Sequence, residues 1–343
     1  MDALVKEQAG PGLALKRVPI PKPRHNEVLI KIHKTAICGT DLHIYNWDDW
    51  AKENIAPPMV IGHEYVGEIA ELGDEVEGLK VGQRVSGEGH IVCGHCRNCR
   101  GGNGQWCAHT VGVGVGRAGA FAEYLCLPSS NVVSIDESLP EDVVAFFDAY
   151  GNATHTALQF DVIGEDVLVT GAGPIGIMAA AICKKNGARQ VIITDVNDYR
   201  LELAKQMGLF TVNVARDDLG EVMRKAHMVE GFDVALEMSG SAQALEQILH
   251  HMRNGGKVAL LGIFKHHAQI NWNDVIFRGL TLQGVYGRKM YETWYKMSAM
   301  IDGGLDLTPI ITHRLPYTQF EAGFEAMNSG RSGKVILDWR KDT

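Results

Sequence analysis

The first 148 residues carry short apolar runs separated by glycine and proline. Residues 28–32 and 66–70 are two such runs, and each has the length of a strand. Apolar runs between turn-forming residues favour β-strands, and long helical patterns are scarce in this part of the chain. We therefore predict a β-rich unit over residues 1–148.

From about residue 161 the pattern changes to β-branched runs that alternate with helical stretches. The expected strands cover residues 167–170, 191–194, 232–236 and 257–261, and the expected helices cover residues 175–185, 199–207 and 242–252. This alternation is typical of βαβ units on a parallel sheet. Residues 149–290 are therefore predicted to form a doubly wound α/β domain.

The end of the chain contains a helical stretch at residues 291–301 and a final strand at residues 334–339. A doubly wound domain is complete without that strand, so we expect the strand to return to the first unit. The first domain would then comprise residues 1–148 together with residues 291–343.

Composition narrows the class of protein. The 343 residues include 33 Lys+Arg and 41 Asp+Glu, a net charge of −8, and the length suits about two domains. An acidic surplus argues against a nucleic-acid surface, which needs clustered Lys and Arg. No apolar run approaches the roughly 20 residues of a membrane-spanning helix, and no charged-then-apolar leader opens the chain. We expect a cytoplasmic protein without nucleic acid or membrane partners.

A glycine motif lies between the first expected strand and helix of the α/β domain. Gly171, Gly173 and Gly176 occupy the positions where a tight turn and close approach to a pyrophosphate are needed. Asp195 ends the next strand, where a carboxylate binds ribose hydroxyls and repels a 2′-phosphate, which favours NAD over NADP. Arg200 has two interpretations: pairing with a 2′-phosphate, which would favour NADP, or stacking on the adenine ring. Two alternatives to an NAD site remain. The glycines could form an ordinary strand-to-helix turn, or the same architecture could bind S-adenosylmethionine or FAD.

Four of the seven cysteines fall within one short glycine-rich segment. Cys93, Cys96, Cys99 and Cys107 have the spacing C-x2-C-x2-C-x7-C. Four thiolates close a tetrahedral zinc shell and leave no position for substrate, so we predict a structural zinc. An iron–sulfur cluster and a nucleic-acid-binding zinc module are the competing interpretations.

A second group of metal-binding residues lies at strand ends in the first unit. Cys38 follows one apolar run, and His63 precedes another. A thiolate and an imidazole are half of a catalytic zinc shell, to be completed by a carboxylate and water. Glu64 and Asp148 are the carboxylate candidates, although adjacent residues of a strand such as His63 and Glu64 point to opposite faces unless the chain turns. Each of these residues, taken alone, also has a purely structural interpretation: Cys38 as a buried thiol, His63 as a core histidine and Asp148 as a helix N-cap.

These segments together resemble the zinc-containing medium-chain dehydrogenase/reductase family. The resemblance rests on the G-H-E-x2-G-x5-G run over residues 62–73, the four-cysteine segment and the glycine motif, and it covers essentially the whole chain. It implies a GroES-like catalytic domain built from both chain ends, with a zinc lobe at about residues 88–110. It also implies an inserted Rossmann NAD domain, two zinc ions per chain and a homotetramer.

Residues 37–50, 87–90 and 147–152 are similar to the branch of the family that oxidises the C3 hydroxyl of L-threonine. This similarity implies catalytic zinc on Cys38, His63 and Glu64, and a proton relay through Thr40 and His43. Asp148 stands where alcohol dehydrogenases usually have a cysteine ligand, and we assign it to the relay or to the surroundings of the metal. The NAD contacts implied by the resemblance are Ile175, Asp195, Arg200, Leu261, Gly262, Ile263, Val285 and Tyr286.

Other functions remain open at the level of sequence. A sorbitol-type or other secondary-alcohol dehydrogenase would carry the same zinc and nucleotide motifs, and a non-catalytic zinc protein could keep the fold. The alternative for His43 is a histidine at the surface or in the surroundings of the metal, without a part in the relay. No short motif displays the groups that would bind an ammonium and a carboxylate, although Glu88 and Glu64 are candidates for the ammonium.

Overall fold

The computed structural model describes residues 1–340, which separate into two compact units. The first unit contains Met1–Ala149, Met290–Ser298 and the chain from Ile311 onward, and the second contains Tyr150–Lys289 and Ala299–Ile310. The sequence prediction assigned all of residues 291–343 to the first domain, whereas Ala299–Ile310 groups with the second unit. In that unit the Asn186 side chain lies 3.6 Å from the Met300 sulfur. The exact domain limits stay a prediction.

The first unit is built around a seven-stranded sheet. Its strand order is β10 (Val132–Ser134), β6 (Arg84–Gly87), β5 (Tyr65–Leu72), β3 (Glu27–Ala36), β18 (Lys334–Asp338) and β17 (Ile311–Pro316), and β9 (Tyr124–Pro128) also pairs with β3. A smaller sheet holds β2 (Ala14–Arg17), β1 (Asp2–Lys6) and β4 (Met59–Val60). Strand β18 pairs antiparallel with β3, Ile336 opposite Ala36, which confirms that the last strand returns to this unit.

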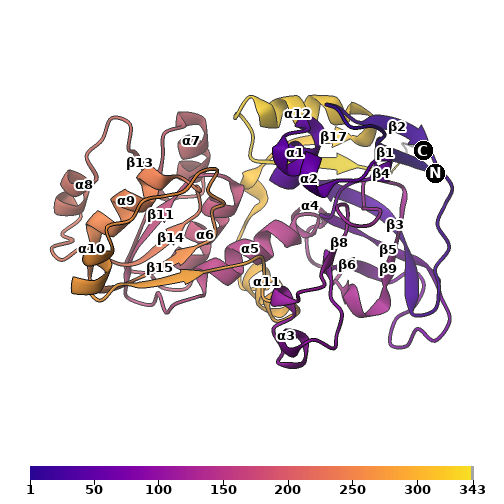
Figure 1. Cartoon of the computed structure of the whole chain (residues 1–343), viewed down its shortest axis with the longest axis horizontal. Helices are drawn as coiled ribbons and strands as arrows, with labels where there is room; N and C mark the ends of the chain where they lie inside the picture. Colours follow the sequence, from indigo (N-terminus) through magenta and orange to yellow (C-terminus); the bar gives the residue numbers. More distant parts are fainter. Residues whose placement is uncertain (341–343) are drawn as a thin grey trace. The chain divides into compact units, whose positions relative to one another are not determined.

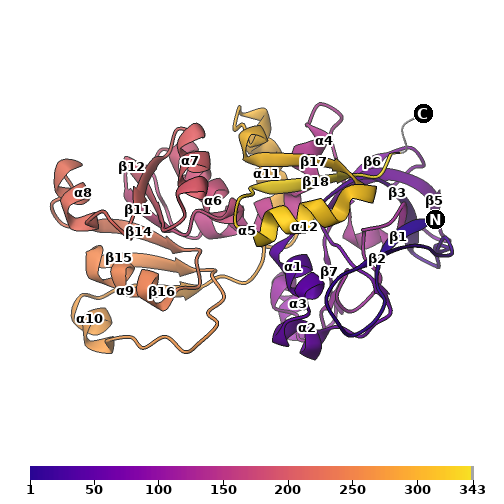
Figure 2. The same cartoon turned by 90° about the horizontal axis from the view of Figure 1, so that it is seen from above.

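Short helices accompany the sheet of the first unit. The helix α1 (Gly39–Asn46) begins directly after β3, and α2 (Asp49–Asn54) follows. Figure 2 shows α12 (Phe320–Asn328) lying along β17 and β18, and its Phe324 ring stacks on Tyr45 of α1 at 4.3 Å. The sequence prediction of a β-rich unit did not include these helices, because each is too short to establish an apolar period.

Several small elements complete the first unit. They are β7 (His90–Ile91), α3 (Arg97–Arg100), the 3-10 turns Gly104–Trp106, Ser129–Asn131 and Tyr317–Gln319, β8 (Val111–Gly112) and α4 (Glu141–Val144). The helix α5 (Phe147–Ala157) begins in the first unit and continues into the second. The helix α11 (Glu292–Asp302) is likewise divided between them.

The second unit contains a six-stranded parallel sheet (Figure 1). The strand order is β13 (Phe210–Asn213), β12 (Gln190–Asp195), β11 (Asp166–Thr170), β14 (Phe232–Glu237), β15 (Met252–Leu260) and β16 (Thr281–Gly284). Its helices are α6 (Pro174–Lys185), α7 (Asp198–Gln206), α8 (Leu219–Lys225), α9 (Ala242–His251) and α10 (Trp272–Phe277), with a 3-10 turn at Thr308–Ile310.

The predicted doubly wound α/β fold is confirmed, and its four expected strands are the four central strands. The edge strands β13 and β16 were missed, because each has only four residues and is not fully buried. Within residues 1–340, no helix combines the length and apolar character needed to cross a membrane.

Candidate metal centres and dinucleotide site

The four cysteines of the predicted zinc lobe come together in the structure. The sulfur atoms of Cys93, Cys96, Cys99 and Cys107 all lie within 4.8 Å of one another. Two of the separations are 3.4 Å, from Cys96 to Cys99, and 3.6 Å, from Cys107 to Cys93. A tetrahedron with zinc–sulfur bonds of about 2.3 Å has edges of about 3.8 Å, so this arrangement fits a zinc ion.

Backbone N–H groups point at the sulfur atoms of this cluster. The N–H of Cys93 and that of His109 donate to the Cys107 sulfur at 3.4 and 3.3 Å, and the N–H of Cys96 donates to Cys93 at 3.4 Å. The two hydrogen bonds to Cys107 lower the pKa of that thiol to about 6, whereas burial and the neighbouring thiols raise the pKa of Cys99 to about 12. The backbone therefore favours the thiolate, the form of cysteine that binds a metal, at Cys107.

A second cluster forms from Cys38, His63 and Glu64, whose ligand atoms lie within 4.8 Å of one another. Strand pairing brings the segments together: β3 pairs antiparallel with β5, Thr35 lies opposite Tyr65, and Cys38 caps the helix that follows β3. His63 and Glu64 precede β5, so the strict alternation of a strand does not apply to them.

Gly62 makes the turn before His63 possible. Its φ is +92°, in the left-handed region, and a Cβ atom there would lie 2.2 Å from the Phe121 ring. Only glycine suits both conditions. The turn explains how His63 and Glu64 both face Cys38. A larger residue in place of Gly62 would displace His63 and Glu64.

Glu64 is paired with a lysine from the far end of the sequence. The Lys334 ammonium lies 2.5 Å from Glu64 Oε2 and also donates to the Ile37 carbonyl at 3.2 Å. Both side chains are buried, and within residues 1–340 Glu64 Oε1 has no hydrogen-bond partner. Burial raises the pKa of Glu64, and the charge of Lys334 opposes that rise. The unpartnered oxygen suits a metal ligand, because a buried carboxylate oxygen needs a partner.

Asp41 adds a further negative charge to this cluster. It is fully buried, accepts the Cys38 N–H at 2.9 Å, and has its other oxygen 3.7 Å from His63 Nδ1. Burial alone would lower the pKa of His63, but Asp41 and Cys38 raise that pKa well above its usual value. The surroundings of His63 therefore attract positive charge, as expected for a cation site.

The three residues assigned to the relay occupy two helices. Thr40 and His43 lie on α1 three residues apart, so they share one face of the helix. Asp148 lies in the first turn of α5 and is buried, and its charge acts on Asp41, His63 and Glu64. The compact group of ligand atoms consists of Cys38, His63 and Glu64, so Asp148 lies in its electrostatic surroundings.

Sequence reasoning missed Lys334 and Asp41, and it offered Glu88 as an ammonium ligand. Lys334 opens the strand Lys334–Asp338, whose three central residues are apolar, and a lysine beside such a run was an available signal. In the structure Glu88 is buried, and its Oε1 accepts the Trp294 indole N–H at 2.7 Å and the Tyr291 N–H at 3.2 Å. That carboxylate oxygen links the lobe segment to α11 rather than facing solvent.

The glycine motif of the second unit has the geometry of a phosphate-binding turn. Gly171 has a φ of +93°, and a Cβ at Gly176 would lie 1.9 Å from the Gly171 carbonyl oxygen. Gly173 caps α6, Pro174 is its first residue, and Ile175 lies in its first turn. The free N–H groups of this helix end suit a pyrophosphate.

Asp195 ends β12, as predicted, beside this turn. Its Oδ2 accepts the Ala172 N–H at 2.7 Å, and its Oδ1 accepts the N–H groups of Val196 and Asn197 at 2.7 and 2.9 Å. Arg200 lies in the first turn of α7, and its N–H donates to the Asn197 side chain. The carboxylate thus holds the glycine turn and still has lone pairs for a ribose.

The turn at Leu261, Gly262 and Ile263 follows β15 on the same edge of the sheet. A Cβ at Gly262 would lie 2.2 Å from the Gly240 nitrogen and 2.3 Å from Glu237 Oε2, so this position requires glycine. Ile263 and Tyr286 are exposed, whereas Val285 is buried. Strands β11, β12, β14, β15 and β16 are parallel, so these segments meet at one edge of the sheet.

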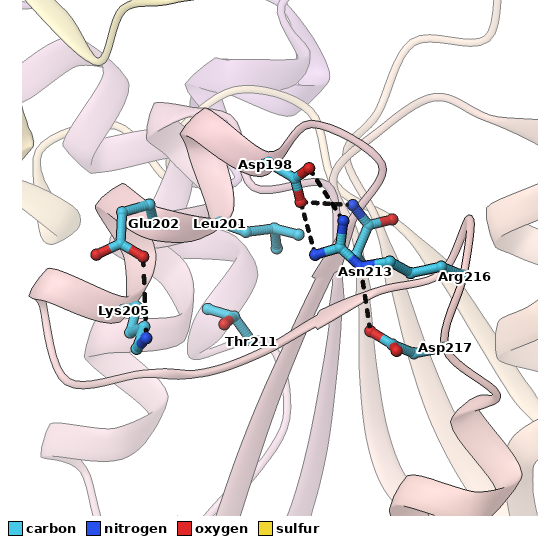
Figure 3. Close-up of a pocket in the computed structure, with 8 residues that line it drawn as sticks. All are labelled: Asp198, Leu201, Glu202, Lys205, Thr211, Asn213, Arg216 and Asp217. Carbon is cyan, nitrogen blue, oxygen red and sulfur yellow. Dashed lines mark hydrogen bonds and ion pairs between the residues drawn. The ribbon is translucent and has the colours of Figure 1, made fainter.

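A cavity of about 390 Å³ lies elsewhere in this unit, beside α7 and β13 (Figure 3). Its charged side chains pair with one another: Asp198 with Arg216 at 2.8 Å, and Glu202 with Lys205 at 3.9 Å. It contains neither metal cluster and no residue of the glycine motif. The cavity is therefore not the candidate active site.

Two family models match the chain. The alcohol dehydrogenase GroES-like domain matches residues 24–137, and the zinc-binding dehydrogenase matches residues 174–303. A protein of Chromobacterium violaceum called L-threonine 3-dehydrogenase is 62% identical over 99% of this chain and 100% of its own length. The chain belongs to the zinc-binding dehydrogenase family. An L-threonine 3-dehydrogenase of Proteus mirabilis is 59% identical over the same shares of the two chains.

Solved structures of zinc-binding dehydrogenases and related enzymes share the fold. An alcohol dehydrogenase from Thermus sp. ATN1 has a TM-score of 0.91 at 29% identity, over 99% of this chain and 100% of that one. A short chain alcohol dehydrogenase from Escherichia coli CFT073, complexed with NADH, has a TM-score of 0.90 at 25% identity, over 99% of each chain. These likenesses confirm the predicted GroES-like and Rossmann fold class.

Proposed function

We propose that this protein is an NAD-dependent L-threonine 3-dehydrogenase. It transfers a hydride from C3 of L-threonine to NAD and yields L-2-amino-3-oxobutanoate and NADH, a step in the conversion of threonine toward glycine. The observation that carries the proposal is the open Cys38, His63 and Glu64 cluster beside Thr40 and His43. Full-length relatives named L-threonine 3-dehydrogenase at 58–62% identity support the choice of substrate.

Two zinc ions per chain are part of this proposal. Cys93, Cys96, Cys99 and Cys107 hold a structural ion, while Cys38, His63 and Glu64 hold a catalytic one. Three protein ligands leave a coordination position for substrate. The catalytic ion, when bound, supplies Lewis-acid stabilisation of the alkoxide form of the substrate hydroxyl.

The residues of the chain move the proton and orient the reactants. Thr40 Oγ1 accepts the proton of the C3 hydroxyl as it donates its own to His43, which passes a proton to water. Histidine suits this step because its ordinary pKa of about 6.5 lies near neutrality. Asp148 and Asp41 keep the surroundings of His63 negative.

The second unit binds and orients the cofactor in this proposal. The turn at Gly171, Gly173 and Gly176 holds the pyrophosphate, and Asp195 binds the adenosine ribose. The same carboxylate repels a 2′-phosphate, which favours NAD over NADP. The remaining proposed contacts are Ile175, Arg200, Leu261, Gly262, Ile263, Val285 and Tyr286.

Assembly as a homotetramer belongs to the same proposal. Helix α10 buries none of its six residues, and Trp272, Ile276 and Phe277 are 61%, 67% and 83% exposed. Strand β16 is an edge strand of the six-stranded sheet. Exposed apolar side chains near an unpaired strand edge favour association with a second copy. We also propose a cytoplasmic location, in keeping with seven free cysteines.

Formation of NADH, followed by absorbance, tests the proposed function. The zinc-loaded protein is mixed with NAD and with L-threonine, sorbitol or 2,3-butanediol in separate reactions. We expect a kcat/KM for threonine at least about a hundredfold above the other two, since a site that pairs with charged substrate groups discriminates strongly. A preference for sorbitol or butanediol would replace the threonine assignment. No NADH with any substrate, despite two bound zinc ions, would contradict the assignment as an enzyme.

A further inference from the structure

A short link joins the helix that carries Thr40 and His43 to the next helix. Trp47 ends α1 in the left-handed conformation, with φ 57° and ψ 47°, and its N–H donates to the His43 carbonyl. Asp48 follows at once as the N-cap of α2. The chain therefore turns sharply and returns α2 toward the His43 side of α1.

The Asp48 carboxylate serves both helices. Its Oδ1 accepts the Ala51 N–H at 3.1 Å, which caps α2. Its Oδ2 pairs with His43 Nδ1. Burial would raise the pKa of Asp48, but the hydrogen bonds with His43 and Ala51 outweigh burial and lower it. The carboxylate is therefore ionised near neutrality and accepts hydrogen bonds from both groups.

A ring of α2 also faces His43. The centroid of the Trp50 indole lies 6.0 Å from that of the His43 imidazole, at an interplanar angle of 52°. The link itself is held from the first strand, because the Lys6 ammonium lies 4.8 Å from the centroid of the Trp47 ring. The His43 imidazole thus meets a carboxylate and an aromatic ring in fixed places.

We propose that Asp48 is the positioning residue of the proton relay. By accepting the Nδ1–H of His43, it fixes the tautomer in which Nε2 carries the free lone pair. Nε2 is then the atom that takes the proton from Thr40 Oγ1, and Nδ1 keeps its hydrogen throughout. This inference rests on the proposed function, since it specifies how His43 performs the proton transfer.

Other charged groups near His43 have partners or face elsewhere. Asp49 of α2 pairs with Lys52 at 2.8 Å, and Asp41 of α1 is buried toward Cys38. Glu321 and Glu325 of α12 act on Tyr45, on the side where α12 packs. Asp48 supplies the charge in direct contact with the His43 ring.

Three variants of the zinc-loaded protein separate positioning from capping and from charge. Asp48→Ser keeps an N-cap oxygen but is too short to reach His43. Asp48→Asn keeps the cap and a carbonyl acceptor but removes the charge. Asp49→Asn removes a charge from the same helix without touching His43, and it is the matched control.

Kinetics with L-threonine and NAD test the proposal across pH. We expect Asp48→Ser to lower kcat/KM about tenfold to a hundredfold, part of the gain that a general base supplies. Asp48→Asn should lose less of kcat/KM than Asp48→Ser, because the amide oxygen still accepts the Nδ1–H of His43 and keeps the same tautomer. Asp49→Asn should stay within about twofold of the parent. Equal profiles for all three variants would overturn the proposal.

Nitrogen-15 NMR of the imidazole gives a readout that does not depend on the substrate. The His43 signals, assigned by their loss in His43→Asn, should show a neutral ring protonated at Nδ1, and Asp48→Ser should lose that preference. A ring protonated at Nε2 in the parent would overturn the proposal even if threonine is oxidised. The expected tautomer in a protein that does not oxidise threonine would instead contradict the proposed function alone.

Discussion

The two metal clusters of this protein are assembled in opposite ways. All four sulfur atoms of the lobe come from residues 93–107, and backbone N–H groups of the same segment donate to them. The open cluster draws Cys38 from the end of β3, His63 and Glu64 from the turn before β5, and its charge partner Lys334 from 270 residues away. The lobe is a local structure, whereas the open cluster exists only when the sheet is complete.

The difference in ligands follows the difference in assembly. Four thiolates satisfy a tetrahedral ion, so nothing else needs to reach it. The open cluster has three donors and a fixed field from buried charges, which Asp41, Asp148 and Lys334 provide. A closed site stabilises the fold, while an open site leaves room for chemistry, and the two should respond differently to the same perturbation.

The largest expected effect is on the lobe. Structural zinc contributes about 10–16 kcal/mol in small zinc domains, so Cys107→Ser should lose one zinc ion and lower the unfolding temperature by roughly 20 °C. Zinc analysis and calorimetry measure both changes, and limited proteolysis should cut within residues 93–107. Cys126→Ser, outside the lobe, should keep both ions. Loss of both ions from Cys107→Ser would mean that the clusters are not independent.

The next effect is on activity at the open cluster. Cys38→Ser should lower kcat/KM for threonine by about a thousandfold or more, because Lewis-acid stabilisation contributes several kcal/mol. The unfolding temperature should change little, since the lobe keeps its ion. A chelator should likewise abolish activity before it removes the lobe zinc. Simultaneous loss of both ions during chelation would remove the distinction between closed and open sites.

A smaller effect concerns the buried ion pair beneath the open cluster. Lys334→Met leaves the Glu64 carboxylate without its buried partner and should lower the free energy of unfolding by about 3 kcal/mol. Denaturant unfolding measures this change. Lys334→Met combined with Glu64→Gln should recover part of the loss, because no buried charge is then left alone. A double variant less stable than Lys334→Met would show that the pair is not the source of the effect.

The smallest expected effect is a pH dependence of the folding stability, which arises at Glu141 near the strand that carries Lys334. A hydrogen bond with His33 at 2.9 Å and the charge of Arg340 hold the pKa of Glu141 below its usual value. A lowered folded pKa contributes stability above the ordinary value of about 4.3, and that stability is lost as pH falls through the folded pKa. Glu141→Gln should therefore cost about 0.5 kcal/mol near neutrality and less toward pH 4 or so. Denaturant midpoints across pH measure it, and a pH-independent cost would contradict the assignment.

The sequence alone was sufficient wherever the determining residues are neighbours in the chain. The cysteine spacing over residues 93–107, the glycine turn over residues 171–176 and the central strands of the parallel sheet all rest on local spacing and periodicity. Cys38 and His63 were also recognisable, because a thiolate and an imidazole at strand ends are unusual. Their joining still depended on the antiparallel pairing of β3 with β5.

Only the tertiary structure decided the partners of these residues. Lys334 reaches Glu64 because β18 pairs with β3, and Asp48 reaches His43 because Trp47 turns the chain back. No periodic pattern in the sequence predicts either contact, because the first depends on long-range strand pairing and the second on one residue in the left-handed conformation. The spacing of donors along the chain therefore predicts where the two candidate metal sites lie, and the fold determined the charges around each site.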